Sequence, residues 1–172
     1  MPNPLIDKRI LLGVTGSIAC YKAVDLASKL RQAGATVDVI LTAAAREFVT
    51  PLTFQSVTGR RAYTDEDLWG AEGHVLHIGL AKAADLFVIA PATANTLAKV
   101  AHGVADNLLA LTAVAAECPL LLAPAMDGGM YDNPATQANL ATLQDRGVHI
   151  LGPAEGHLAS GLKAVGRMVE PA

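Results

Sequence analysis

The chain is poor in aromatic residues, cysteine and charge, and each shortage excludes a class of protein. Aromatic side chains make up only 4% of the 172 residues although 52% are hydrophobic, so the core must be built from Ala, Leu, Val and Ile. The two cysteines, Cys20 and Cys118, lie too far apart in the sequence to suggest a disulfide framework or a metal site. A formal net charge of -3 provides no basic surface for a nucleic-acid partner.

Long apolar runs and targeting signals are missing as well. A helix that crosses a bilayer needs about 20 apolar residues, and every apolar run here is shorter. The N-terminal residues 1–8 lack the charged-then-apolar order of a secretory signal. We therefore expect a cytoplasmic protein with no membrane partner and, given its length, a single domain.

Short aliphatic runs alternate with longer segments of helical periodicity. The pattern predicts strands over 9–14, 36–41, 85–90, 119–124 and 148–152, and helices over 18–32, 42–48, 77–83, 96–102, 106–115 and 133–146. Residues 50–73, with mixed charge and Trp69, are predicted to form an irregular lid or subunit contact. The alternation predicts an α/β fold, with an open parallel sheet and helices on both faces.

Polar and glycine-rich segments follow the ends of the predicted strands, at 13–17, Thr42, 91–96 and 124–130. The carboxyl ends of parallel strands lie along one edge of an open sheet, and ligands bind at that edge. We therefore expect these segments to line a ligand site.

Each segment also has a plain structural interpretation. Glycines and a helix start at 13–17 suit a phosphate, and Ser17 either donates to that phosphate or caps the helix. Thr42 is likewise a helix cap or a phosphate contact. The small residues of 91–96 permit close approach of a flat ring, and Asn95 offers donors and acceptors to its edge. The alternative there is capping by Asn95 or Thr96.

Seven segments together resemble the flavin-containing cysteine decarboxylases. They run in family order over nearly the whole chain, at 13–22, 77–78, 91–96, 103–108, 124–130, 158–162 and 166–168. The similarity is greatest to the phosphopantothenoylcysteine decarboxylase part of bacterial bifunctional coenzyme A biosynthesis proteins. It implies a single-domain Rossmann-like flavoprotein over residues 1–172, with a C-terminal flap at about 153–168.

The resemblance implies FMN as the cofactor and no metal ion. The residues expected at FMN are Gly16, Ser17, Thr42, Thr93, Ala94, Asn95, Thr96 and Met130, and those expected at the substrate are Met126, Asp127 and Ala159. A methionine beside an apolar strand is also typical of plain core packing. Family members place each site between subunits of a trimer, and bacterial members stack trimers into a dodecamer. A phosphopantothenoylcysteine synthetase would be fused to the chain or work with it.

The implied reaction is oxidative decarboxylation of the cysteine moiety of 4'-phosphopantothenoylcysteine, which yields 4'-phosphopantetheine after reduction of an enethiol. His77 matches the active-site histidine of the family, and its ordinary pKa of about 6.5 suits proton transfer. A helix-capping or interface histidine is the alternative. Asp106 and Asn107 would lie near the subunit contact or the flavin.

Two positions depart from the family pattern. Asp127 stands where the family has an asparagine that holds the substrate carboxylate, and Ser160 stands where it has a cysteine that donates a proton. Asp127 could be protonated, could turn toward backbone donors, or could select another substrate. A protonated Asp127 would also supply the acid that Ser160 cannot, so both are candidate catalytic residues. The alternative functions are a peptidyl-cysteine decarboxylase that stops at the enethiol and a catalytically silent FMN-binding regulatory subunit.

Overall fold

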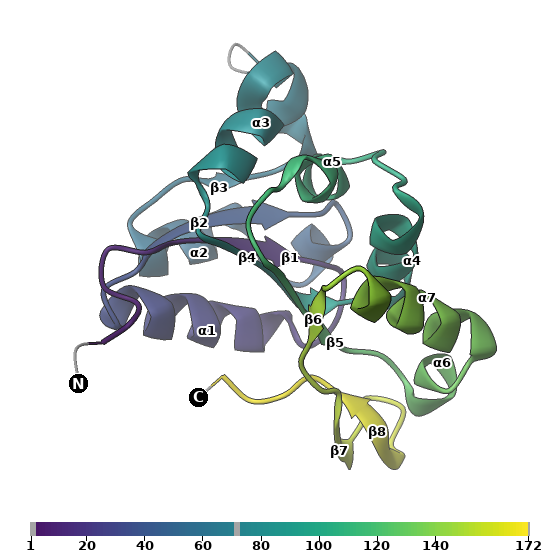
Figure 1. Ribbon diagram of the computed structural model, residues 1–172. Helices are drawn as coiled ribbons and strands as arrows, with labels where there is room; N and C mark the ends of the chain where they lie inside the picture. The colour runs from purple at the N-terminus through teal and green to yellow at the C-terminus, as the bar shows by residue number, and fades with distance from the viewer. Residues whose placement is uncertain (1–2, 71–72, 172) are drawn as a thin grey trace.

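The computed structural model describes residues 3–70 and 73–171, which form a three-layer α/β fold (Figure 1). Its centre is a six-stranded sheet in the order β3-β2-β1-β4-β5-β6, with every neighbouring pair parallel. The strands are β1 (Arg9–Val14), β2 (Thr36–Leu41), β3 (Ala62–Tyr63), β4 (Leu86–Ala92), β5 (Leu120–Pro124) and β6 (His149–Ile150). The predicted fold class is confirmed.

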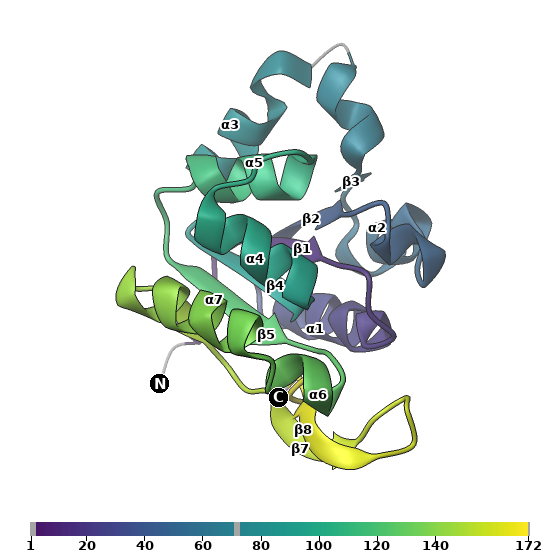
Figure 2. The same cartoon turned by 90° about the vertical axis from the view of Figure 1, so that its right-hand side faces the viewer.

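Helices cover both faces of this sheet. They are α1 (Cys20–Gln32), α2 (Pro51–Thr58), α3 (Gly73–Ala83), α4 (Ala94–His102), α5 (Leu108–Ala115), α6 (Gly128–Tyr131) and α7 (Pro134–Asp145). Two short 3-10 turns, η1 (Ala45–Glu47) and η2 (Asp65–Trp69), lie between β2 and α3. α1 and α2 pack on one face, and α3, α4, α5 and α7 lie on the other, with α4 beside α7 (Figure 2).

Alternation along each strand divides the apolar residues between the two faces. In β1, Ile10 and Leu12 belong to the core under α1 and α2, whereas Leu11 belongs to the core under the other helices. At Gly13 an added Cβ would lie only 2.8 Å from Leu109 Cδ1, so glycine lets α5 pack directly onto β1. The central strand is thereby buried from both sides, as a parallel sheet requires.

The strand order reverses between β1 and β4. The chain moves outward from β1 to β2 and β3, and then returns to place β4 on the other side of β1. The loops after β1 and β4 therefore diverge to opposite faces and leave a crevice at their carboxyl ends. This crevice is where the candidate site lies.

The prediction that residues 50–73 are irregular was wrong, while their expected role as a lid or subunit contact stays a prediction. The segment contains α2, β3 and η2, with Trp69 87% exposed at the end of η2, while residues 71–72 lie outside the described part. Pro51 occupies the first turn of α2, and Gly59, at φ 70°, ends it. Both are ordinary helix boundary signals in a segment too short to show strong periodicity. The helix expected over 42–48 is also wrong, since only the single turn η1 forms there.

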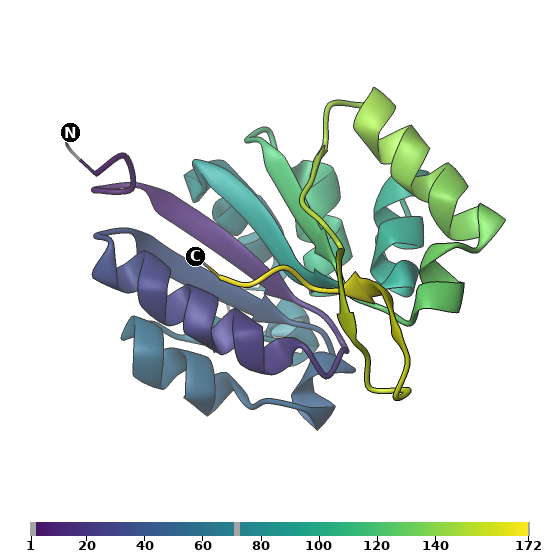
Figure 3. The same ribbon diagram turned by 90° about the horizontal axis from the view of Figure 1, so that it is seen from below.

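The C-terminal segment forms an antiparallel hairpin apart from the main sheet, made of β7 (Ala154–His157) and β8 (Lys163–Arg167). We call residues 153–168 the flap. The chain then runs back beside α1, where Lys22 Nζ donates to Met168 O at 2.6 Å and Lys29 Nζ to Pro171 O at 2.6 Å (Figure 3). Within the described residues, no helix has the length and hydropathy needed to cross a bilayer.

Candidate functional site

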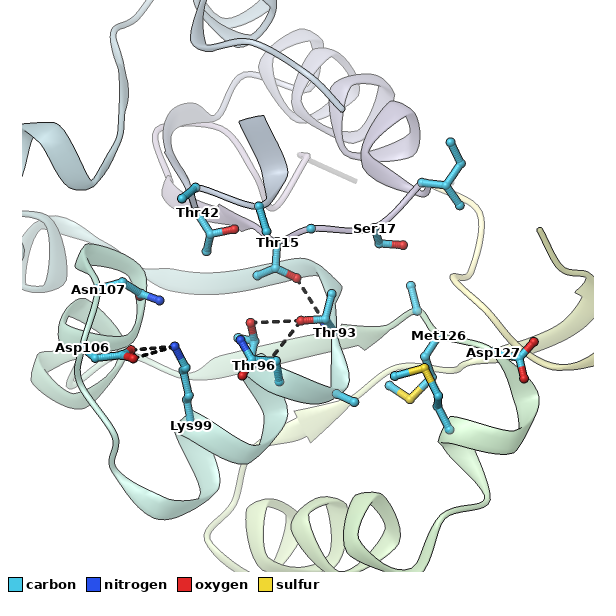
Figure 4. A pocket seen from close by; sticks show the side chains of 18 of the residues that line it. Thr15, Ser17, Thr42, Thr93, Thr96, Lys99, Asp106, Asn107, Met126 and Asp127 are labelled. Atoms are coloured by element: carbon cyan, nitrogen blue, oxygen red, sulfur yellow. Dashed lines mark hydrogen bonds and ion pairs between the residues drawn. The ribbon is translucent and has the colours of Figure 1, made fainter. Parts of the chain in front are cut away.

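The predicted loops meet around one cavity of about 620 Å³ at the carboxyl ends of β1 and β4 (Figure 4). We call it the main cavity. Its walls come from the β1–α1 loop, the β2–η1 loop, the start of α4, the turn before α5 and the β5–α6 loop. They include every residue predicted for the cofactor: Gly16, Ser17, Thr42, Thr93, Ala94, Asn95, Thr96 and Met130. They also include Met126 and Asp127.

Thr15 joins the two loops that flank the crevice, a role the sequence alone did not reveal. Its hydroxyl donates to Pro91 O at 2.6 Å and accepts a hydrogen bond from Thr93 N at 3.1 Å. The side chain is almost fully buried, so these bonds satisfy a polar group that would otherwise be costly there. Thr15 therefore fixes the spacing between the opposite walls of the main cavity.

Gly16 brings a third loop into contact with the first. A Cβ at Gly16 would lie 2.5 Å from Ala44 Cβ, so only glycine permits this approach of the β2–η1 loop. Thr42 lies beside it and accepts a hydrogen bond from Ala45 N at 3.2 Å, as a turn cap does. Ser17 Oγ accepts from Ala19 N at 3.2 Å. Both residues line the cavity, and neither caps a helix, since α1 and η1 have no side-chain cap. The Thr42 hydroxyl donates to Val14 O at 3.5 Å, whereas Ser17 Oγ only accepts among the described residues, so its hydrogen can be donated to a ligand.

Thr93 caps the start of α4, so the alternative of capping by Asn95 or Thr96 is wrong. Thr93 Oγ1 accepts from Thr96 N at 3.3 Å and lies 3.2 Å from Thr96 Oγ1. The cap falls earlier because α4 begins at Ala94. Asn95 is thus released from capping and stays exposed on the cavity wall, where its amide can meet a heterocycle edge.

The far end of the main cavity carries charge. Lys99 Nζ pairs with both oxygens of Asp106, at 2.7 and 2.8 Å, and this hydrogen bond lowers the pKa of Asp106. Asn107 caps α5, and Asp65 Oδ1 accepts from Leu108 N at 2.8 Å. Lys99 and Asp65 were missed by the sequence reasoning, because their position depends on how η2 packs against α5. The ionisable lining, Lys99 with Asp65, Asp106 and Asp127, has an acidic excess.

Asp127 lies at the opposite end, and the flap contacts it there (Figure 4). Ser160 Oγ donates to Asp127 Oδ2 at 2.6 Å, and Gly129 N donates to Asp127 Oδ1 at 3.0 Å. The Ser160 hydroxyl first, and then the Gly129 N–H, lower the pKa of Asp127 below its usual 3.8. The carboxylate thus turns toward donors, the second of the three possibilities, and these donors favour its ionised form over the protonated one.

A second cavity of about 230 Å³ lies under the flap, and we call it the flap cavity. It shares five wall residues with the main cavity: Ser17, Ile18, Ala125, Met126 and Asp127. Ala159 and Ser160 line it, as expected for a substrate-covering flap. The flap base is held tightly, since Met126 N donates to Gly166 O at 3.0 Å and a Cβ at Gly166 would overlap Met126 O.

His77 does not line either cavity. It lies on α3, and its Nδ1 atom is buried without a hydrogen-bond partner among the described residues. The structure thus gathers the other predicted residues and leaves this one apart. In residues 3–70 and 73–171, no group of three or more His, Cys, Asp or Glu side chains could hold a metal ion.

Comparison with known sequences places these features in context. The family described as Flavoprotein matches residues 2–171. The coenzyme A biosynthesis bifunctional protein CoaBC of Vibrio vulnificus strain YJ016 is 48% identical over 167 residues, which are 97% of this chain. The chain spans about two fifths of the length of that relative, 42%.

Solved structures show the same architecture. A PPC decarboxylase mutant, C175S, complexed with pantothenoylaminoethenethiol superposes with a TM-score of 0.86 at 36% identity, covering 96% of this chain and 92% of that one. The FMN-dependent cysteine decarboxylase SpaF superposes with a TM-score of 0.83 at 38% identity, covering 94% and 91%.

Proposed function

The chain belongs to the flavoprotein family, and from that premise we propose that it binds FMN and decarboxylates the cysteine moiety of 4'-phosphopantothenoylcysteine. The observation that carries the proposal is the pair of joined cavities at the β1/β4 crevice. One has the walls expected for a flavin, and the other lies under a flap that a substrate would enter. The relatives named above act in coenzyme A biosynthesis or decarboxylate cysteine, in agreement with this assignment.

The main cavity fits FMN in size and chemistry. Its volume of about 620 Å³ lies in the range of small-molecule sites. The acidic excess at its far end disfavours a phosphate there. At the β1–α1 loop the lining is neutral and includes the hydroxyls of Ser17 and Thr42. The phosphate would therefore be held at Ser17 and Thr42, with the flavin ring against Asn95 and Met130. When bound, FMN would supply a two-electron acceptor for the cysteine moiety.

The residues of this chain would orient the substrate and exclude water. Met126 forms the shared wall between the cavities, so a cysteine moiety entering from the flap cavity would meet the flavin there. Asp127 has both oxygens engaged by donors and cannot donate to a substrate carboxylate. A carboxylate left without a strong cationic partner is not stabilised in the ground state, which favours loss of carbon dioxide.

His77 would act on the cavity of a neighbouring subunit. Its Nδ1 on α3 is buried and has no partner in the described part of the chain, which makes it the kind of group that a subunit contact satisfies. Apolar side chains beside it on α3 are exposed, with Val75 51% and Ile78 37% accessible. We therefore include a homo-oligomer with shared sites in the proposal, and a trimer or a dodecamer of trimers would both provide such contacts.

The first test is the mass of the product after anaerobic incubation of the FMN-loaded protein with 4'-phosphopantothenoylcysteine. Loss of carbon dioxide alone supports the complete reaction. Loss of carbon dioxide and two hydrogens supports the alternative enzyme that stops at the enethiol, which Ser160 favours because its hydroxyl is bonded to a carboxylate and is a weak acid. An unchanged substrate contradicts both.

Shared sites can be tested by mixing two inactive variants. His77→Asn removes the proposed proton carrier, and Asn95→Trp fills the main cavity. Differently tagged copies of the two, co-expressed and purified through both tags, should regain activity if His77 serves a neighbouring cavity. Activity that stays absent in the mixed oligomer, while mixed wild-type and His77→Asn protein is active, would contradict sharing.

A further inference from the structure

The flap cavity differs from the main cavity in the charge of its lining. Its ionisable side chains are Lys22, His157, Arg167, Tyr21 and Asp127, so cations exceed anions. The main cavity has one lysine against three aspartates. A ligand with a dianionic end would therefore be repelled from the far end of the main cavity and would meet less negative charge, with cationic donors, under the flap.

Arg167 is the cation best placed to bind such a group. Its Nη2 donates to Glu170 Oε1 at 2.7 Å, which leaves other N–H groups of the guanidinium uncommitted. Lys22, by contrast, is 3% exposed and donates to both Met168 O and Glu170 Oε1. Glu170 thus pairs with both cations, and with Asp127 it balances their charge, so the flap cavity is less acidic than the main cavity but not positive overall. Buried Lys22 anchors Glu170, and the guanidinium of Arg167, which also pairs with Glu170, lines the cavity.

The flap sequence directs Arg167 into this position. A Cβ at Gly156 would lie 2.6 Å from Arg167 Cδ, so the glycine on β7 leaves the space that the arginine stem occupies. His157, the next residue on β7, lines the same cavity. The sequence reasoning assigned no role to His157, and the hairpin brings it to the cavity that Arg167 lines.

We propose that the flap cavity binds the phosphate ester of the substrate, with Arg167 as the main recognition residue and His157 as a second donor. The inference rests on the proposed function, because it assigns a subsite to the phosphorylated arm of that substrate. A planar guanidinium matches two phosphate oxygens at once, which lysine cannot do. The subsite would make the enzyme select phosphorylated substrates over cysteine-terminated peptides, which lack this group.

The test compares 4'-phosphopantothenoylcysteine with unphosphorylated pantothenoylcysteine in wild-type protein, Arg167→Gln and Arg167→Lys. Arg167→Gln should lower kcat/KM about 10- to 100-fold for the phosphorylated substrate, mainly through KM, and leave the other substrate within about twofold. Arg167→Lys should lie between. Lys163→Gln, on the same strand with its side chain 65% exposed and absent from the cavity wall, is the matched control and should change neither.

Three other outcomes would overturn the proposal, and each has a distinct signature. Equal losses on both substrates would make Arg167 a structural residue. A fall in FMN affinity in Arg167→Gln would mean that the cofactor phosphate, not the substrate phosphate, binds there. If wild-type protein turns over neither substrate, the proposed function fails, and binding of 4'-phosphopantetheine and pantetheine to FMN-loaded protein still tests the subsite. Equal affinities for these two would then refute it.

Discussion

Ser160 Oγ on the flap lies 2.6 Å from Asp127 Oδ2 on the β5–α6 loop, so the two positions that depart from the family pattern are in direct contact. A carboxylate is a stronger acceptor than an amide oxygen, and a hydroxyl is a suitable donor to it. The two substitutions therefore form one interaction that holds the tip of the flap against the wall shared by the cavities.

Breaking this contact should loosen the flap tip. We expect Ser160→Ala and Asp127→Ala each to lower kcat/KM about 3- to 10-fold, with the larger loss in Asp127→Ala because it also removes the acceptor of Gly129 N. The double variant should lose no more than Asp127→Ala, because the bond between Ser160 and Asp127 is absent in all three. Limited trypsin digestion should cleave faster after Lys163 in each. Ser56→Ala, which removes an exposed hydroxyl bonded to Leu52 O, should leave that cleavage rate unchanged. Additive losses in the double variant would show that the residues act separately.

The activity should not depend on titration of Asp127 near neutral pH. Its pKa is lowered from 3.8, first by the Ser160 hydroxyl and then by the Gly129 N–H. Because the pKa of Asp127 is lower in the folded protein, its ionised carboxylate stabilises the folded flap at pH values above the ordinary pKa of an aspartate. This stabilisation is lost only as the pH falls through the lowered pKa. Between about pH 5 and about pH 9, log kcat/KM should therefore show no inflection that Asp127→Asn removes. Such an inflection would instead indicate that Asp127 acts as the proton donor of the reaction.

Gly16→Ala should weaken FMN binding. The new Cβ would lie 2.5 Å from Ala44 Cβ, which forces the β1–α1 and β2–η1 loops apart and separates the Ser17 and Thr42 hydroxyls. We expect the FMN dissociation constant, measured by flavin fluorescence titration, to rise at least about 10-fold. Gly70→Ala is the control, since its Cβ would make an ordinary 3.6 Å contact with Asp67 O. Equal FMN affinity in the two variants would show that this loop does not bind the FMN phosphate.

Leu122→Ala should destabilise the central sheet. The side chain is fully buried in β5, so its loss leaves a cavity under α4 and α7 and should cost about 2–5 kcal/mol of unfolding free energy. Leu52→Ala, at a position 68% exposed, should cost less than about 0.5 kcal/mol. Urea unfolding at fixed protein and FMN concentrations gives both values, because bound cofactor and assembly also contribute to apparent stability.

The regular strands and the ligand edge could be predicted from the sequence because both depend on local pattern. Five strands were found at nearly their observed positions, and the loops after β1, β2, β4 and β5 line the main cavity. The segment 50–73 could not be resolved, because α2 and β3 are too short for periodicity to identify them.

Contacts between distant residues explain the other differences. Thr15 bonds to Pro91 across 76 residues, and Ser160 reaches Asp127 across 33, so neither partner could be identified from local sequence. The protonated Asp127 was a reasonable expectation for a carboxylate in a dry site without donors. The structure supplies two donors, the Ser160 hydroxyl and the Gly129 N–H, and these favour the ionised carboxylate.

The wall from Ala125 to Asp127 belongs to both cavities, so the proposed flavin and substrate would contact the same residues, and we expect their binding to be coupled. Any shift of Met126 that improves the fit of one ligand changes the surface offered to the other. Thermodynamic linkage then requires reciprocity: the factor by which a phosphorylated substrate tightens flavin binding equals the factor by which flavin tightens the substrate. Retention of the cofactor between turnovers is thus a property that the substrate itself can adjust.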